Sequence, residues 1–185
     1  MLFRFKDKKQ YRLPNYDYSG NGYYFITICT KNREHFFGKV IDGRMRLSSI
    51  GKIAKYHWRK NPKRFSSVHL DEFIVMPNHL HGIIIIDNRS NAPCRNAPRR
   101  VPTIRPLIKN SLSSIINHYK GAVKNDCKRK GFEYFNWQSR FYDHIIRNEK
   151  SLVNIQAYIR NNPLRWYLDR NNPENLFIWK HFSAI

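Results

Sequence analysis

Acidic residues are scarce in this 185-residue chain, which has 13 Asp and Glu against 34 Lys and Arg and a formal net charge of +21. Most of the cations therefore have no internal partner. They must stay solvated or meet an anion, most commonly a polyphosphate backbone. The imbalance predicts a nucleic-acid-binding protein. A basic surface that merely keeps the protein soluble is the plainer alternative.

Cysteines and long apolar runs are also few. Cys29, Cys94 and Cys127 are odd in number and form no Cys-x-x-Cys pair, which argues against a disulfide framework and against zinc ribbons or fingers. The longest apolar run, Ile83–Ile86, is far too short to span a membrane, and the N-terminus lacks the apolar core of a signal peptide. We therefore expect a cytoplasmic protein with no membrane partner.

Apolar residues are nonetheless ample, since 41% of the chain is hydrophobic. Segments rich in β-branched and aromatic residues predict strands at 23–30, 69–76, 79–87 and 132–146, with a hairpin turn at Asp42-Gly43. Helical spacing predicts helices from Ser48 or Ser49 to Asn61-Pro62, over 108–124 and over 148–161. Two long helices crossing one antiparallel sheet indicate a ferredoxin-like fold of the α+β class.

The length favours one domain over residues 1–185. Three segments stand apart from the predicted elements. They are a basic N-terminal arm at about 1–12, a mobile basic loop at about 88–106 and a C-terminal tail at about 164–185. We expect the aromatic tail to dock on the body of the domain.

Two histidines, His79 and His81, begin the predicted strand at 79–87. Residues two apart on a strand share a face, so both imidazoles project to one side while Leu80 points into the core. That geometry suits a shared metal ion. A His-x-His pair alone is a weak signal, and two ordinary strand histidines are the alternative.

Tyr158 and Asn162 are four apart on the last predicted helix, so they lie on one helical face. The apolar stripe of that helix leaves Tyr158 at its flank, with an accessible hydroxyl. A tyrosine nucleophile in phosphodiester cleavage needs a polarised phosphate, which a metal with open positions supplies. Two imidazoles and an amide oxygen suit Mg or Mn. The alternatives are a core tyrosine and an asparagine that terminates the helix.

Four motifs together carry a resemblance to a known family. They are Tyr24–Thr30, Val75–Gly82, Trp137-Gln138 with Tyr142–Glu149, and Tyr158–Pro163. With these motifs the chain resembles the single-tyrosine His-hydrophobic-His transposases, and within them the REP-associated tyrosine transposases. The match runs in order from about Tyr11 to Glu174. Tyr142 lies in an equally similar block, but only Tyr158 has an amide residue one turn away.

The resemblance implies a ferredoxin-like sheet with helices on one face and a C-terminal helix that bears the nucleophile Tyr158. It implies a divalent metal, Mg or Mn, on His79, His81 and Asn162, and asparagine at the third position is typical of the REP-associated branch. The implied reaction is cleavage or strand transfer of single-stranded hairpin DNA through a covalent 5′-phosphotyrosine. The implied protein is a monomer or homodimer in the bacterial cytoplasm, associated with the nucleoid.

Basic residues near the expected site are candidate phosphate contacts, although each alone could be a solvated surface charge. They are Lys120, Lys124, Arg140, Arg147, Arg160 and Arg165. Two other functions stay open. One is a non-catalytic hairpin DNA or RNA binding protein with the same fold. The other is a metal-dependent hydrolase in which water attacks and Tyr158 is structural.

Overall fold

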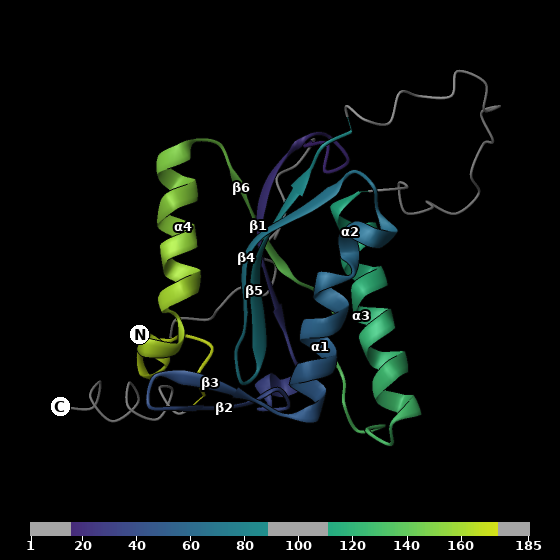
Figure 1. The fold of residues 1–185 in the computed structure, drawn as a ribbon, viewed down its shortest axis with the longest axis vertical. Helices are drawn as coiled ribbons and strands as arrows, with labels where there is room; N and C mark the ends of the chain where they lie inside the picture. The colour runs from purple at the N-terminus through teal and green to yellow at the C-terminus, as the bar shows by residue number, and fades with distance from the viewer. Residues whose placement is uncertain (1–15, 89–110, 174–185) are drawn as a thin grey trace, which may run out of the picture.

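The computed structural model describes residues 16–88 and 111–173, and Figure 1 shows their arrangement. The basic arm expected at 1–12 lies outside the described residues. So do all but the first residue of the loop expected at 88–106 and the part of the expected tail beyond residue 173. No helix of the described residues is long and apolar enough to cross a membrane.

A four-stranded antiparallel sheet organises the fold, with strand order β4-β5-β1-β6. Its strands are β1 (Gly22–Cys29), β4 (Val68–Val75), β5 (His79–Ile86) and β6 (Tyr142–Ile146). Helix α1 (Ser49–Arg59) connects β1 to β4, and α3 (Leu112–Arg129) connects β5 to β6. This order and connectivity are those of the ferredoxin-like fold, so the predicted fold class is confirmed.

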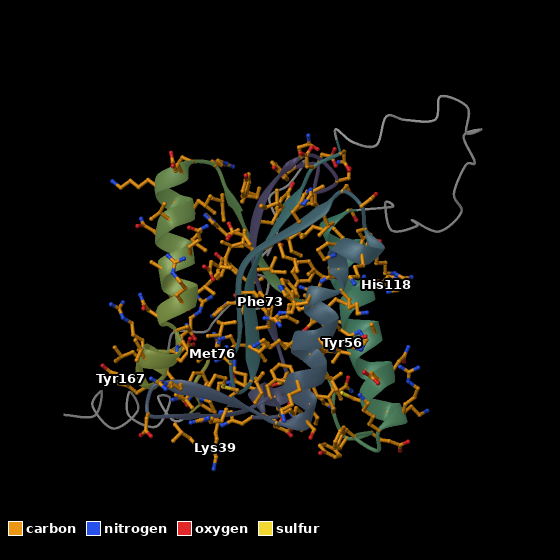
Figure 2. The ribbon with its side chains drawn as sticks, viewed as in Figure 1. Lys39, Tyr56, Phe73, Met76, His118 and Tyr167 are labelled. Carbon is orange, nitrogen blue, oxygen red and sulfur yellow. The ribbon has the colours of Figure 1, made fainter. Side chains whose placement is uncertain are left out.

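Helices cover both faces of the sheet. Helices α1 and α3 lie on one face together with the short α2 (Asn61–Arg64), and α4 (Glu149–Asn161) lies on the other (Figure 1). Side chains fill the layers between sheet and helices (Figure 2). The larger core cluster includes Trp58 of α1 and Tyr119 of α3, and a smaller one joins Ile83 of β5 to Ile159 of α4. Strand β5 is therefore covered on both faces, which accounts for its largely apolar sequence.

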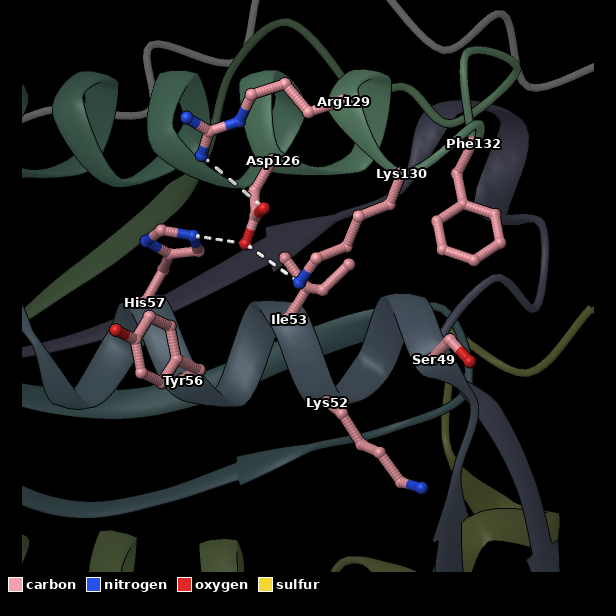
Figure 3. Close-up of a pocket in the computed structure, with 9 residues that line it drawn as sticks. All are labelled: Ser49, Lys52, Ile53, Tyr56, His57, Asp126, Arg129, Lys130 and Phe132. Atoms are coloured by element: carbon pink, nitrogen blue, oxygen red, sulfur yellow. Dashed lines mark hydrogen bonds and ion pairs between the residues drawn. The ribbon is translucent and has the colours of Figure 1, made fainter.

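The two helices of the larger layer also meet through a polar contact. His57 Nε2 on α1 lies 3.1 Å from Asp126 Oδ2 on α3, and Arg129 and Lys130 reach the same carboxylate (Figure 3). The Tyr119 hydroxyl donates to the carbonyl oxygen of Ala54 at 3.2 Å. Hydrogen bonds thus link α1 to α3 at both buried and half-buried positions.

Capping residues set the starts of the helices. The side chains of Ser48, Ser111 and Asn148 accept hydrogen bonds from the third backbone N–H that follows each of them, at the starts of α1, α3 and α4. Helix α4 ends at Asn161, and Pro163 begins the 3-10 segment η2 (Pro163–Leu168). The predicted hairpin is present as β2 (Gly38–Ile41) and β3 (Arg44–Leu47), with Asp42 and Gly43 at its turn.

Three predicted boundaries were wrong. The strand expected over 132–146 spans only β6, because the aromatic residues Phe135 and Trp137 enter the core from a loop and not from a strand. Helix α3 continues to Arg129, five residues past its predicted end, since Val123 and Cys127 extend its buried stripe. Helix α3 also begins at Leu112, after its N-cap Ser111, and not at about 108. The helix end expected at Asn61-Pro62 is confirmed, since α1 ends at Arg59 and the separate short helix α2 begins at Asn61.

Candidate metal and tyrosine site

Strand β5 places His79 and His81 on the face of the sheet that α4 covers. Both side chains are fully buried, and their ring centroids lie 4.3 Å apart. Leu80 between them points to the opposite face and belongs to the larger core cluster. Alternation along a strand accounts for this division, because successive side chains point to opposite sides.

Hydrogen bonds orient both imidazoles. The amide nitrogen of Asn78 donates to the carbonyl oxygens of Arg33 and Asn171, so its Oδ1 faces His79 Nδ1 at 2.8 Å. Because that oxygen can only accept, His79 Nδ1 carries the proton and Nε2 carries a lone pair. His81 Nδ1 lies 2.8 Å from the Thr27 hydroxyl on β1. Such partners at Nδ1 are typical of histidines whose Nε2 binds a metal.

Burial keeps both histidines neutral. It lowers the pKa of His79 to about 3, and Arg33, Arg170 and His35 act in the same direction. It also lowers the pKa of His81, an effect that His79 reinforces. Neutral imidazole is the form that coordinates metals, so neither ring must lose a proton before binding one.

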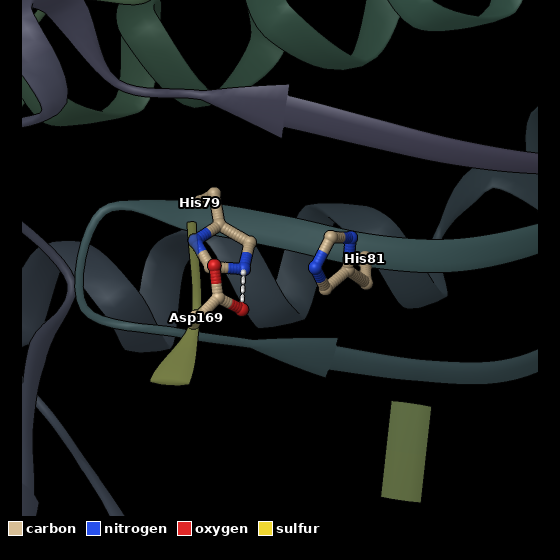
Figure 4. A group of neighbouring side chains, drawn as sticks. All are labelled: His79, His81 and Asp169. Carbon is tan, nitrogen blue, oxygen red and sulfur yellow. Dashed lines mark ion pairs between the residues drawn. The ribbon is translucent and has the colours of Figure 1, made fainter. Parts of the chain in front are cut away.

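Asp169 completes a cluster with the two histidines. His79, His81 and Asp169 each offer one ligand atom, and these atoms lie within 4.8 Å of one another (Figure 4). His79 Nε2 lies 3.8 Å from Asp169 Oδ2. Asp169 directly follows η2, and its carboxylate is held by the Asn171 backbone N–H at 2.6 Å and by Asn162 Nδ2 at 3.0 Å.

The sequence analysis did not identify Asp169. The residue belongs to the tail that was expected only to dock on the body, and no spacing rule relates it to the His79 motif. Its one signal in the sequence is position, because it stands between two Asn-Asn-Pro segments that begin at Asn161 and Asn171. Asn171 and Asn172 are both buried beside it.

Helix α4 brings Tyr158 to the same cluster. The Tyr158 hydroxyl lies 3.2 Å from His81 Nε2, and its ring meets Phe25 of β1 edge-on at 6.1 Å. The residue is 43% exposed, so its ring stays open to solvent while its hydroxyl faces the histidines. Burial of the hydroxyl raises the pKa of Tyr158 to about 12; Asp169 also raises it, whereas Arg170 and Asn162 oppose the shift.

Asn162 lies beneath Tyr158, one helical turn later, and is buried. Its Nδ2 donates to Asp169, and its Oδ1 has no hydrogen-bond partner among the described residues. Asn162 is also the C-cap residue of α4, so its backbone ends the helix as the alternative interpretation expected. The two roles involve different atoms of the residue and are compatible.

Comparisons with known proteins identify relatives over most of the chain. The chain is 41% identical to an uncharacterized protein of Haemophilus influenzae, over 88% of this chain and 92% of that protein. It is 27% identical to a second Haemophilus influenzae protein, named as a candidate REP-associated tyrosine transposase, over 83% of this chain and 77% of that one. No family model matches the chain.

A solved structure shares the fold. It is a REP-associated tyrosine transposase bound to a REP hairpin, with a TM-score of 0.56 and 20% identity, and the match covers 85% of this chain and 74% of that one. The chain is thus similar to REP-associated tyrosine transposases in both sequence and fold. The resemblance drawn from the four sequence motifs is thereby confirmed.

The predicted cations are spread over several elements. On α3, Lys120 donates to the backbone carbonyl oxygens of Gln138 and Arg140. Lys124 of the same helix donates to Asn136 Oδ1 at 2.9 Å. Arg160 of α4 forms an ion pair with Glu72 Oε1 at 2.8 Å. The other three predicted cations are exposed at the ends of β6 and in η2. They are Arg140, Arg147 and Arg165.

Tyr142, the other tyrosine in a family-like block, begins β6. It pairs with Thr27 across β1 and β6, and the guanidinium of Arg170 lies 5.6 Å from its ring centroid. The described structure gives its hydroxyl no contact with either histidine, whereas that of Tyr158 lies against His81. Of the two tyrosines, the structure therefore brings only the Tyr158 hydroxyl to the histidine cluster.

Proposed function

We propose that this protein is a REP-associated tyrosine transposase, a metal-dependent enzyme that cleaves or transfers single-stranded hairpin DNA through a covalent 5′-phosphotyrosine at Tyr158. The observation that supports this most is the position of the Tyr158 hydroxyl, 3.2 Å from His81 Nε2 and beside the His79–Asp169 pair. The REP hairpin bound by the solved relative supports a hairpin as substrate.

The residues of the cluster fit a divalent metal ion. The buried atoms His79 Nε2 and Asn162 Oδ1 find no hydrogen-bond partner among the described residues. Buried polar atoms are rarely left in that state, so a ligand that satisfies them both is expected. We propose His79, His81, Asp169 and Asn162 as the residues that would hold the ion.

A mixed set of imidazole, carboxylate and amide donors suits Mn²⁺ or Mg²⁺, each of which leaves coordination positions open. When bound, such an ion polarises a phosphate oxygen and stabilises the charge that develops on it in the transition state. Asp169 adds a negative charge that two neutral imidazoles cannot supply. This charge would favour a divalent cation over water at the same place.

Tyr158 supplies the nucleophilic oxygen in the proposed reaction. Its hydroxyl is protonated at neutral pH, because its pKa is about 12. It would therefore lose its proton as the new oxygen–phosphorus bond forms, while the bond from phosphorus to the 3′ oxygen breaks. The products would be a 5′-phosphotyrosine and a free 3′-hydroxyl, and the retained phosphodiester energy would allow rejoining by the reverse attack.

A hollow beside Tyr158 offers a path for the unpaired strand. It has a volume of about 470 Å³ and lies between α4 and β6, where Phe25, Tyr142 and Lys150 are among its lining residues. Phe25 also meets the Tyr158 ring edge-on, so one lining residue of the hollow contacts the proposed nucleophile. Aromatic rings beside a cation are suited to stacking unpaired bases and binding the backbone phosphates.

The test is incubation of the protein with labelled hairpin DNA and Mn²⁺, followed by a denaturing gel. We expect a labelled protein band with wild type and with Tyr142→Phe, and none with Tyr158→Phe or with His79→Ala. Cleavage by Tyr158→Phe at the wild-type rate would instead identify a hydrolase that uses water. Tight hairpin binding with neither cleavage nor adduct would identify a binding protein.

A further inference from the structure

The face of the sheet opposite Tyr158 carries a second concentration of positive charge. Helices α1, α2 and α3 form this face, whereas α4 and the histidine cluster lie on the other side of the sheet (Figure 1). The proposed reaction at Tyr158 therefore makes no use of it. Its charges need a separate explanation.

The charges of this face are nearly all of one sign. From Gly43 to Leu70 the chain has no Asp or Glu, yet α1, α2 and the residue between them present six cations. They are Lys52, Lys55, Arg59, Lys60, Lys63 and Arg64, and all but the half-buried Lys55 are exposed. The sole carboxylate of α3, Asp126, is buried under His57, Arg129 and Lys130. An anionic ligand would thus meet little repulsion here.

Tyr56 stands at the centre of this basic face. It is 54% exposed, whereas Tyr119, the tyrosine of α3, is buried in the core. Three hollows of about 780, 460 and 550 Å³ all share Tyr56 in their lining, so its ring is bordered by open space on several sides. Lys60 Nζ lies 4.9 Å from the ring centroid, and the His57 ring lies 5.2 Å away.

This combination fits a single-stranded nucleic acid. An exposed ring can stack on an unpaired base, and flanking lysines can neutralise the phosphates on either side of that base. A duplex would engage the lysines but not the ring, because its bases are stacked on one another. The aromatic residue among the cations therefore distinguishes a single-strand surface from a general basic patch.

We infer that the α1–α2–α3 face, centred on Tyr56, is a second binding surface for single-stranded DNA, separate from the Tyr158 site. The choice of DNA rests on the proposed function, whereas the recognition of phosphates and of a base face rests on the surface itself. The ligand we propose for this face is a segment of the same DNA beyond the hairpin. The two surfaces together would hold a strand on both sides of the domain.

The experiment measures fluorescence anisotropy of a labelled 15-nucleotide oligo-dT in EDTA, with Tyr158→Phe as the parent protein so that no adduct forms. We expect Tyr56→Ala to weaken binding about tenfold, the loss typical of removing one stacking ring, and Tyr56→Phe to stay within about twofold of the parent. Lys52→Gln and Lys63→Gln should each make the salt dependence shallower. Equal melting temperatures would show that the variants are folded.

Tyr134→Ala is the matched control, because Tyr134 is 65% exposed but lies beside Glu133 and lines none of the three hollows. It should bind oligo-dT as the parent does. Unchanged binding by Tyr56→Ala would overturn the inference, and so would a duplex that competes as well as the single strand. An oligo-rU that binds more tightly, and through Tyr56, would overturn the assignment to DNA.

The reaction at Tyr158 and the second binding surface can be refuted independently of one another. Adduct formation at Tyr158 that persists in Tyr56→Ala, under saturating hairpin, would show that the second surface is distinct from the reaction site. Oligo-dT binding that depends on Tyr56, in a wild-type protein that forms no adduct, would uphold this surface while the proposed reaction fell.

Discussion

Gly82 is the residue whose substitution tests the packing behind the histidine cluster. It follows His81 on β5 and faces the opposite side of the sheet. A Cβ added there would lie 2.6 Å from Trp58 Cζ2 and 3.1 Å from Phe73 Cβ. The glycine is thus needed because the indole of Trp58 packs directly against the strand at this position.

The size of the effect follows from that clash. Carbon atoms in contact lie about 3.5 to 4.0 Å apart, so Trp58 or β5 must move by about 1 Å. Trp58 is fully buried between Phe73 and Tyr119 and has no free space to swing into. We expect Gly82→Ala to lower the free energy of unfolding by about 1 to 3 kcal/mol, the usual range for overpacking. At this chain length that corresponds to a fall in Tm of roughly 2 to 12 °C.

Urea unfolding of the purified variants measures this change. The matched control is Gly121→Ala on α3, where the added Cβ meets nothing within 4 Å. Because alanine favours a helix more than glycine does, this control should be stabilised by about 0.5 to 1 kcal/mol. The double variant Gly82→Ala/Trp58→Leu should lose less stability than the sum of the two single variants, because the smaller side chain at position 58 relieves the clash. Gly82→Ala at or above wild-type stability would refute the packing argument.

Three further predictions concern the site and the charges. Asp169→Ala should weaken Mn²⁺ binding, measured by calorimetry, by at least about tenfold, because even a residue that only hydrogen-bonds a metal ligand typically contributes that much. The control Glu133→Ala should leave Mn²⁺ binding unchanged. Burial raises the pKa of Asp126, but His57 and Lys130 outweigh it and the net shift is downward, so Asp126→Asn should be less stable than wild type near pH 7. That difference should close as pH falls below 3.8 through the folded pKa, because the carboxylate then protonates in both states, and a constant difference in urea titrations would contradict it. If Arg147 contacts a phosphate, Arg147→Gln should reduce the slope of log affinity against log salt concentration for hairpin binding by about one. An unchanged slope would show that Arg147 does not contact the DNA.

The sequence analysis succeeded where a short repeat decides geometry. The two-residue spacing of His79 and His81 placed both rings on one face, and the four-residue spacing of Tyr158 and Asn162 placed both over the same cluster. The alternation of helices and strands was enough for the ferredoxin-like class. Each of these inferences depends on neighbours within one element.

Long-range contacts were beyond such rules. Asp169 reaches the histidines because the chain leaves α4 at Pro163 and η2 brings it back to the cluster, a path that no periodicity encodes. The strand predicted over 132–146 was too long because Phe135 and Trp137 alternate like strand residues. In the structure a loop carries both of these side chains into the core. A core position can therefore be filled by a side chain from a loop as well as from a strand or a helix.

The same reasoning explains the two tyrosines. Tyr142 and Tyr158 both lie in family-like blocks, and only tertiary structure shows that the Tyr158 hydroxyl meets His81 while Tyr142 lies on the edge strand β6. The sequence preference for Tyr158 depended on Asn162. In the structure that asparagine does lie beside the cluster, where it donates to Asp169.

Peptide mapping of the covalent adduct tests the central claim most directly. Trypsin separates the two tyrosines, because Tyr142 falls in the peptide 141–147 and Tyr158 in the peptide 151–160. After reaction with hairpin DNA and Mn²⁺, nuclease trimming and tryptic digestion, mass spectrometry should find a nucleotide phosphate on peptide 151–160. A nucleotide on peptide 141–147, or cleaved DNA with neither peptide modified, would contradict Tyr158 as the nucleophile.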